Sequence, residues 1–301
     1  MKEGLKVWLD GDFLNYDDAK VPILTHSLQY GSGIFEGIRA YRNERGTAVF
    51  RLHDHIRRFF NTAKIYRMQL KYSPDEISNA ILDLLRMNRL DECYIRPFAF
   101  YNDDGIGLSP YGKRVSLFIG AVPFGKYLSR GNGAKCKTST WKRINSGILP
   151  VQAKASGNYL NSLVANLEAR SMGFDEAIML GENGYIAEGP GENIFIVRDG
   201  TLITPPVESD ILVGITRDSI IKIARSVGIN TVERNIHREE IYIADEAFFV
   251  GTAAEITPIE SVDNIVIGNG KVGDITSKLL KEYMDVVHGR NEKFISWLTQ
   301  V

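Results

Sequence analysis

One lysine stands alone in a segment that is otherwise free of charge. Between Arg143 and Glu168, Lys154 is the only charged side chain, although charged residues make up 24% of the sequence. An amine buried away from water has a lowered pKa, because burial disfavours the ammonium form, and the neutral amine attacks carbonyl carbons. Lys154 is therefore a candidate for covalent chemistry with a carbonyl group. The alternative is a lysine whose charged end reaches water at the start of a helix.

Two acids and an amide interrupt a pair of short apolar segments further along the chain. Glu188, Glu192 and Asn193 lie within Tyr185–Phe195, whose other residues are apolar or small. A carboxylate in a buried strand needs a partner, and a cationic heterocycle would be such a partner. A solvated hairpin edge that carries two acids explains the same pattern, and the residues alone leave both interpretations open.

Two loops have the composition of phosphate-binding sites. Val213–Asp218 lies at the start of a predicted helix, and Gly251–Ala254 directly follows a predicted strand. Backbone N–H groups at a helix N-terminus bind anions, and small residues let a phosphate come close. Taken singly, each loop is more often an ordinary turn and helix cap.

Three further patterns carry little functional signal. Gly31–Gly37 resembles a dinucleotide-binding fingerprint, but its last glycine is one residue late and a strand-like segment follows instead of a helix. His53 and His55 could bind a metal, yet residues two apart on a helix point to different faces, so we expect no metal site. Cys93 and Cys136 lie in no metal-binding spacing and are expected to be buried free thiols.

The composition bounds the kind of protein and its partners. With 301 residues, 44% of them hydrophobic, the chain is long enough for two packed units. Its 36 basic and 37 acidic residues leave a formal charge of -1, so we expect no binding to nucleic acid or to an anionic membrane. We see no leader and no apolar run of membrane-spanning length. We expect a cytoplasmic protein that acts on small molecules.

The first 124 residues are predicted to form a small α+β domain. A hairpin split at Gly11 begins it, and Ser73–Glu76 is a capping box with proline at the first helical position. Hydrophobic periodicity places helices at 51–70 and from residue 73 onward. Strands are predicted at 5–10, 12–14, 93–101 and 114–123.

The glycine-rich segment 125–134 is predicted to link this domain to a large α/β domain at 135–301. A helix predicted at 158–171 has Leu160, Leu163, Val164 and Leu167 on the face that we expect to be buried. Further helices are predicted at 216–227 and 275–287, and strands at 135–141, 177–180, 185–188, 193–197, 202–204 and 247–250.

Six segments together match the motifs of one enzyme family: His26–Arg39, Tyr94–Pro97, Lys154–Leu160, Glu188–Phe195, Gly214–Arg217 and Gly251–Thr257. The chain resembles the branched-chain amino-acid aminotransferases, which are class IV aminotransferases with fold type IV of the pyridoxal-phosphate enzymes. The likeness extends from about Trp8 to the C-terminus. It implies a two-domain fold, α+β and α/β, with pyridoxal 5′-phosphate in the cleft between the domains.

The resemblance implies a role for each residue of a cofactor site. Lys154 would bond covalently to the cofactor's aldehyde and would then move the proton between the substrate Cα and the cofactor. Glu188 would hold the proton on the pyridine nitrogen, and Tyr159 would hydrogen-bond the ring's phenolic oxygen. Asn193 would only support these contacts. The phosphate would be held by Arg58, Thr252 and the N–H groups of Ile215 and Thr216.

The resemblance also implies a substrate site. Tyr94 and the backbone of Thr252 and Ala253 would receive the α-carboxylate, whereas Arg96 would receive the γ-carboxylate of glutamate. Leu108 and its loop would close the pocket of a neighbouring subunit, so a homodimer or higher homo-oligomer is expected. The apolar pocket for the substrate side chain would be lined by Tyr30, Phe35, Phe124 and Tyr127, although some members of the family have tryptophan at the position of Phe124.

The predicted function is a ping-pong transfer of the amino group of leucine, isoleucine or valine to 2-oxoglutarate, with amino acids and 2-oxo acids as the small-molecule partners. A D-amino-acid aminotransferase or an aminodeoxychorismate-lyase-like enzyme on the same fold would share Lys154 and Glu188 but hold the carboxylate differently. Tyr94–Arg96 favours the branched-chain interpretation. Alternatives from other classes are a metal-dependent hydrolase that uses His53 and His55, and a binding protein without catalysis.

Overall fold

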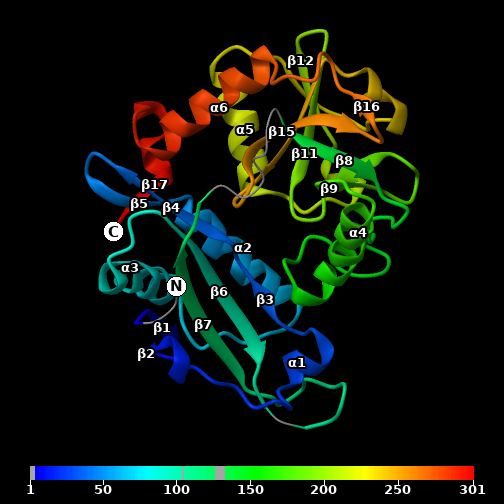
Figure 1. Cartoon of the computed structure of the whole chain (residues 1–301). Coiled ribbons are helices and arrows are strands. Elements are labelled where there is room, and N and C mark those ends of the chain that lie inside the picture. Colours follow the sequence, from blue (N-terminus) through cyan, green and yellow to red (C-terminus); the bar gives the residue numbers. More distant parts are fainter. Residues whose placement is uncertain (1–3, 104, 126–132) are drawn as a thin grey trace. The chain divides into compact units, whose positions relative to one another are not determined.

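A computed structural model describes residues 4–103, 105–125 and 133–301 of the chain. The chain divides into two compact units, both drawn in Figure 1. Unit 1 comprises Met1–Gly125, Ala153–Gly157 and Val286–Val301, and unit 2 comprises Lys126–Gln152 and Asn158–Asp285. Two segments that the sequence places in the second domain, Ala153–Gly157 and Val286–Val301, therefore group with unit 1. Contacts with residues far away in the chain decide this grouping, and local hydrophobic patterns do not encode them.

The described residues of unit 1 form an eight-stranded antiparallel sheet. Its strands are β1 (Lys6–Leu9), β2 (Asp12–Asn15), β3 (Ile34–Phe35), β4 (Ile38–Asn43), β5 (Gly46–Phe50), β6 (Cys93–Tyr101), β7 (Val115–Pro123) and β17 (Leu298–Gln300). Their order is β17-β5-β4-β6-β7-β1-β2, and β3 pairs with β6. The ladder between β6 and β7 runs from Cys93 opposite Pro123 to Tyr101 opposite Val115.

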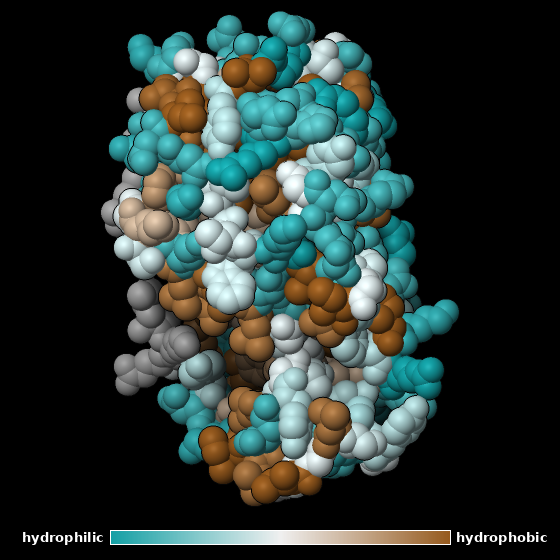
Figure 2. Space-filling model, turned by 90° about the vertical axis from the view of Figure 1, so that its right-hand side faces the viewer, coloured by the Kyte–Doolittle hydropathy of each residue, from teal (hydrophilic) through white to brown (hydrophobic). Residues whose placement is uncertain are grey.

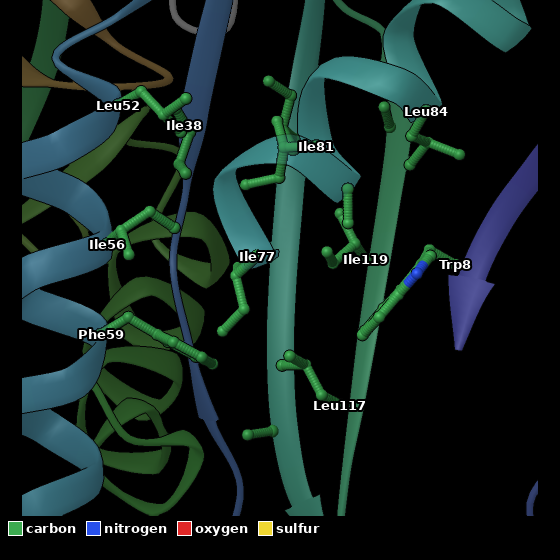
Figure 3. Close-up of a cluster of buried hydrophobic side chains, with 14 of the residues drawn as sticks. Trp8, Ile38, Leu52, Ile56, Phe59, Ile77, Ile81, Leu84, Leu117 and Ile119 are labelled. Atoms are coloured by element: carbon green, nitrogen blue, oxygen red, sulfur yellow. The ribbon is translucent and has the colours of Figure 1, made fainter. Parts of the chain in front are cut away.

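Helices of unit 1 pack on this sheet and close its core. They are α1 (His26–Tyr30), α2 (Leu52–Ile65) and α3 (Pro74–Asn88), with the short 3-10 turns Tyr16–Asp18 and Glu292–Trp297. Apolar residues recur along one face of α2 and one face of α3, and these faces are buried. Figure 3 shows Ile56 and Phe59 from α2 and Ile77 and Ile81 from α3 in one cluster with Leu117 and Ile119 of strand β7.

Local signals set the ends of these helices. The capping box predicted before α3 is confirmed, because Ser73 Oγ accepts from the N–H of Glu76 at 3.2 Å and the Glu76 carboxylate accepts from the N–H of Ser73 at 2.7 Å. Helix α2 ends at Ile65, five residues before the predicted Leu70. Arg67 there adopts a left-handed conformation with φ of 55°, which closes the last turn.

The described residues of unit 2 form a nine-stranded mixed sheet. Its strands are β8 (Ala134–Thr138), β9 (Glu176–Leu180), β10 (Ile186–Glu188), β11 (Asn193–Arg198), β12 (Thr201–Thr204), β13 (Thr231–Glu233), β14 (Glu246–Gly251), β15 (Glu255–Val262) and β16 (Ile265–Val266). Their order is β10-β9-β8-β15-β14-β11-β12-β13, and β16 pairs with β15. The helices are α4 (Tyr159–Ser171), α5 (Ile215–Ser226) and α6 (Asp274–Val287), with 3-10 turns at Ser156–Asn158, Val207–Ser209 and Arg238–Ile243.

Several elements are not predicted by the sequence analysis, among them α1, β5, β13, β15, β16 and β17. Strand β15 lies inside the sheet, between β8 and β14, yet it contains Pro258. Proline has no backbone N–H and argues against a central strand. Pairing with both neighbouring strands outweighs the missing donor, and Pro258 lies opposite Phe248.

Helix α4 buries a different face from the one that the sequence predicts. Leu160, Leu163 and Leu167 are 63%, 49% and 56% exposed, whereas Ala165 and Ala169 are fully buried. The two alanines share a cluster with residues of β9. Side chains as small as alanine let a helix approach a sheet closely, so the prediction of a buried leucine face is wrong.

On the face shown in Figure 2, brown patches lie between larger teal areas. Leu28 on α1, and Ile106 and Leu108 in the loop after β6, are 59%, 89% and 76% exposed. Among the residues that the structure describes, no helix combines enough length with enough apolar character to cross a membrane.

The face that α4 buries can be tested by two substitutions. Leu163→Ala should change the free energy of unfolding by less than about 0.5 kcal/mol, because the leucine is half in water. Ala165→Leu should lower it by about 1 to 3 kcal/mol, because the added methylenes do not fit against the sheet. Urea denaturation at a fixed protein concentration measures both. A larger loss for Leu163→Ala than for Ala165→Leu would restore the sequence-based assignment.

Candidate active site

Backbone hydrogen bonds hold Lys154 in unit 1. The N–H of Phe35 donates to the carbonyl of Lys154 at 3.0 Å, and the N–H of Ser156 donates to the carbonyl of Gly33 at 2.8 Å. The N–H of Lys154 donates to Oγ1 of Thr62 on α2 at 3.2 Å. Lys154 is half-buried, with Nζ 4.9 Å from the centre of the Phe35 ring. These three hydrogen bonds fix the backbone at Lys154 and so the place from which its amine extends.

A buried carboxylate orients Arg58 on α2. Glu36, which is fully buried, accepts from Arg58 Nε at 2.7 Å through one oxygen and from Nη2 at 2.8 Å through the other. His55, one turn earlier on α2, donates from Nδ1 to the same carboxylate at 2.8 Å. A two-point contact fixes the plane of a guanidinium group as well as its position. Arg58, the predicted phosphate ligand, is thus held in one orientation.

The charges of this cluster follow from its burial. Burial alone would raise the pKa of the Glu36 carboxyl, but the Arg58 guanidinium and the hydrogen bonds lower it well below its usual range. Burial lowers the pKa of His55 despite the opposing effect of Glu36, so the ring is neutral near pH 7. Arg58 is therefore the charge that balances Glu36. His55 is a satisfied buried residue, while His53 is exposed.

The predicted carboxylate ligands lie together on β6. Tyr94 and Arg96 are two residues apart on the strand, so they share a face, and Tyr94 Oη lies 3.4 Å from Arg96 Nη2. The Arg96 guanidinium lies 4.6 Å from the centre of the Phe35 ring. The Phe124 ring lies 5.1 Å from that of Tyr94. A Cβ atom at Gly37 would lie 1.9 Å from Tyr94 Oη, so only glycine leaves room for the hydroxyl.

Of the other predicted substrate residues, Tyr30 contacts the loop that follows β6, and Leu108 lies in it. Tyr30 is 39% exposed, and its hydroxyl accepts from the N–H of Gly107 at 3.2 Å. Leu108 itself is 76% exposed, so its side chain contacts little of unit 1. Tyr127 lies outside the residues that the structure describes.

Glu188 in unit 2 is buried among donors. It is 5% exposed, and its carboxylate accepts from Nδ2 of Asn193 at 2.9 Å and from the N–H of Leu212 at 3.2 Å. Nε of Arg143 lies 2.8 Å from Oε1, and the two groups form an ion pair that does not meet the geometry of a hydrogen bond. Glu192 is 6% exposed. The alternative of a solvated hairpin edge is therefore wrong.

One predicted phosphate element of unit 2, the start of α5, lies close to Asn193. Gly214 is the N-cap of α5, and a Cβ atom there would lie 1.9 Å from Asn193 Oδ1, so a side chain at this position would displace the amide. The first N–H groups of a helix, here those of Ile215 and Thr216, have no acceptor within the helix. Such N–H groups can bind an anion, which is consistent with the phosphate role predicted for Ile215 and Thr216. Thr252, with Ala253 beside it, lies in the turn between β14 and β15.

Tyr159 and Asn158 lie at the start of α4. Tyr159 is half-buried and is the first residue of the helix. The Asn158 side chain makes no capping hydrogen bond at the start of α4 and donates to the carbonyl of Pro150 at 3.1 Å. Asn158 therefore fixes the loop before the helix.

Comparison with known proteins decides the family. The family model described as amino-transferase class IV matches residues 33–262. The chain belongs to the class IV aminotransferases. A branched-chain-amino-acid aminotransferase of Pseudomonas aeruginosa is 47% identical over 298 residues, which cover 98% of this chain and 97% of that protein.

Solved structures of the same family agree in fold. The branched-chain aminotransferase of Thermoproteus uzoniensis with norvaline has a TM-score of 0.94 at 49% identity, and the match covers 98% of each chain. A T.th. branched-chain amino acid aminotransferase complexed with N-(5'-phosphopyridoxyl)-L-glutamate has a TM-score of 0.96 at 41% identity, covering 100% of this chain and 99% of the other. The fold type IV that the sequence resemblance implies is thereby confirmed.

Sequence reasoning missed several residues that orient the site of this class IV aminotransferase. In unit 1, Glu36 bonds Arg58, His55 bonds Glu36, and Thr62 accepts from the N–H of Lys154. In unit 2, Arg143 forms an ion pair with Glu188. Glu36 lies inside a recognised motif, and Arg143 borders the charge-free segment, so both carried a signal. No local pattern pairs either one with a partner more than twenty residues away.

Removing the charge of Glu36 tests the cluster. Glu36→Gln should lower the free energy of unfolding by about 3 to 5 kcal/mol at pH 7, because Arg58 is left buried without its counter-charge. The folded-state pKa of Glu36 is lowered, so its contribution is complete above the unfolded value of about 4.3 and declines as the pH falls below it. The difference between variant and wild type should therefore shrink in acid.

Urea denaturation between about pH 3.5 and 8 measures this effect. Glu44→Gln is the matched control, since Glu44 is exposed in the same unit and its loss should change little. A deficit of Glu36→Gln that grows in acid contradicts the assigned charges.

Proposed function

We propose that this class IV aminotransferase is a pyridoxal-phosphate enzyme that moves the amino group of branched-chain L-amino acids to 2-oxoglutarate. The reaction proceeds in two half-reactions, with one 2-oxo acid leaving before the next enters. The observation that carries the proposal is the placement of Lys154 by the backbone of β3 and by α2, the helix that also bears Arg58. The norvaline and phosphopyridoxyl-glutamate complexes of two relatives support it.

The donor set of the chain fits pyridoxal phosphate. Unit 1 offers an amine for the aldehyde, at Lys154, and an oriented guanidinium for the phosphate, at Arg58. Unit 2 offers a buried carboxylate for the pyridine nitrogen, at Glu188, and the N-terminus of α5 for an anion. The N-cap of α5 is Gly214, which has no side chain. When bound, the cofactor supplies an electron-withdrawing ring that stabilises negative charge at the substrate Cα.

Residues of this chain would perform the proton transfers and hold the cofactor. Lys154 takes the proton from the substrate Cα and returns it on the cofactor side. Glu188, oriented by Asn193 and Arg143, keeps the pyridine nitrogen protonated. Further cofactor contacts are assigned to Tyr159 at the phenolic oxygen and to Ile215, Thr216 and Thr252 at the phosphate.

The substrate residues serve two kinds of side chain in turn. Tyr94, with the backbone of Thr252 and Ala253, would receive the α-carboxylate. Arg96 would receive the γ-carboxylate of glutamate, and its exposure lets it turn away when an alkyl side chain is bound. The apolar wall is assigned to Tyr30, Phe35, Phe124 and Tyr127, and Leu108 is assigned to the pocket of a neighbouring copy in a homodimer.

The choice of amino donor separates this proposal from a D-amino-acid aminotransferase or a lyase on the same fold. L-Leucine should convert the absorbance of the bound aldehyde cofactor to that of its amine form, and D-alanine should not. The reverse pattern would replace the proposal by the D-amino-acid assignment. A survey of L- and D-amino acids in single half-reactions gives this result without a coupled assay.

Lys154→Ala should abolish transamination, because no other group supplies the amine for the aldehyde and the proton transfer. Lys64→Ala is the matched control, since Lys64 is exposed on α2 of the same unit and should retain full activity. Borohydride reduction followed by peptide mass analysis should find pyridoxyl on Lys154 in wild type. Modification of a different lysine would contradict the assignment of Lys154 to the cofactor aldehyde.

Arg96→Ala should weaken the half-reaction with glutamate by at least about tenfold more than that with leucine. A hydrogen-bonded charged contact contributes about 1.5 to 3 kcal/mol, and only glutamate has a second carboxylate to use it. Stopped-flow measurement of kcat/KM for each half-reaction tests this expectation. Equal losses with both substrates would remove Arg96 from the γ-carboxylate role.

A further inference from the structure

A buried histidine outside the proposed catalytic set contacts the loop that carries Leu108. His26 is the first residue of α1 and is 1% exposed. Its Nδ1 lies 2.8 Å from Oγ of Ser32, and its Nε2 lies 3.1 Å from the carbonyl oxygen of Leu108. The N–H of His26 also donates to the carbonyl of Asp103, at the start of the same loop. One residue thus contacts the loop at two points.

A series of hydrogen bonds connects the Leu108 carbonyl, the His26 ring, Ser32, Ser27 and the N–H of Tyr101. The carbonyl of Leu108 can only accept, so Nε2 of His26 carries the hydrogen. At the other end, the N–H of Tyr101 can only donate, and it donates to Oγ of Ser27 at 2.9 Å. Oγ of Ser27 lies 3.0 Å from Oγ of Ser32. In the ring form that carries its hydrogen on Nε2 alone, Nδ1 accepts from the Ser32 hydroxyl, and Ser32 in turn accepts from Ser27.

We propose that His26 is a positioning residue that holds the Leu108 loop through a ring that carries a hydrogen on Nε2. When Nε2 alone carries it, the donors run in one direction, from the backbone of Tyr101 through Ser27 and Ser32 to His26, and end at the loop. A proton on Nδ1 in place of Nε2 would leave Nε2 and the Leu108 carbonyl as two facing acceptors. The chain of bonds therefore selects one tautomer and one ring orientation.

A neighbouring contact strengthens the hold on the loop. The Tyr30 hydroxyl accepts from the N–H of Gly107 at 3.2 Å, and its ring lies 4.7 Å from the ring of His26. Leu108, by contrast, has its own side chain largely in water. The loop backbone is thus fixed while its apolar side chain remains available for a substrate pocket.

The role in substrate binding rests on the proposed function, in which Leu108 closes the pocket for the substrate side chain. A loop that is ordered before binding costs less to immobilise when the substrate arrives. Loosening it should therefore raise KM for leucine and leave kcat nearly unchanged, because His26 touches neither the amine of Lys154 nor a reacting atom. A small substrate such as L-alanine, which reaches the loop least, should be affected least.

Two substitutions of His26 separate its ring nitrogens. In His26→Asn the amide can replace Nδ1 toward Ser32, but it is too short to reach the Leu108 carbonyl. In His26→Gln the amide nitrogen can take the place of Nε2 and restore the bond to the loop. Hydrogen exchange in the peptide that contains Gly107 and Leu108 should be about fivefold to tenfold faster in His26→Asn and near wild type in His26→Gln.

Kinetics and NMR of the holoenzyme complete the test. KM for L-leucine should rise about fivefold to tenfold in His26→Asn, with kcat within about twofold, and His26→Gln should restore it. His53→Asn, at an exposed site on α2, is the control. In 15N-histidine spectra the signal lost in both His26 variants should show hydrogen on Nε2.

Each outcome bears on a separate part of the proposal. Equal exchange in His26→Asn and wild type, or hydrogen on Nδ1, overturns the anchoring role. Faster exchange without a change in KM overturns the role in substrate binding. Exchange and tautomer are measured without turnover, so a wild-type protein that fails to transaminate would reject the proposed function and leave the anchoring result standing.

Discussion

The backbone pairing between residues 154–156 and residues 33–35 is the constraint on which the candidate site of unit 1 depends. It draws a short segment away from its neighbours in the chain and adds it to β3. Lys154 thereby comes to lie against α2, where its N–H donates to Oγ1 of Thr62. Arg58 lies one helical turn before Thr62. An amine whose backbone is fixed in this way can react and move a proton without losing its position.

Two buried carboxylates give the polar groups of each unit their orientation. Glu36 holds Arg58 in unit 1, and Arg143 lies against Glu188 in unit 2. Buried ion pairs contribute little net stability, because desolvation offsets much of the attraction. Their value here is orientation, since each pair includes one residue assigned to the cofactor and one that fixes its direction. Neutral His55 adds a hydrogen bond to Glu36 without adding charge.

Close approach explains two glycines of the family motifs. At Gly37 the missing side chain admits the Tyr94 hydroxyl, and at Gly214 it admits the Asn193 amide. Both amide and hydroxyl belong to the proposed site, so these glycines protect the geometry of neighbouring residues. His26 plays a comparable part for the loop of Leu108, because its ring lies between Ser32 Oγ and the Leu108 carbonyl.

The sequence by itself determined the features that depend on near neighbours and on recognisable motifs. These include the capping box before α3, the strands β6 and β7, and Lys154 and Glu188 as candidates. Only the tertiary structure decided which face of α4 is buried, that Pro258 lies in a central strand, and which partners hold Arg58 and Glu188. Helix capping and periodicity act over a few residues, whereas burial and ion pairing depend on segments that meet only after folding.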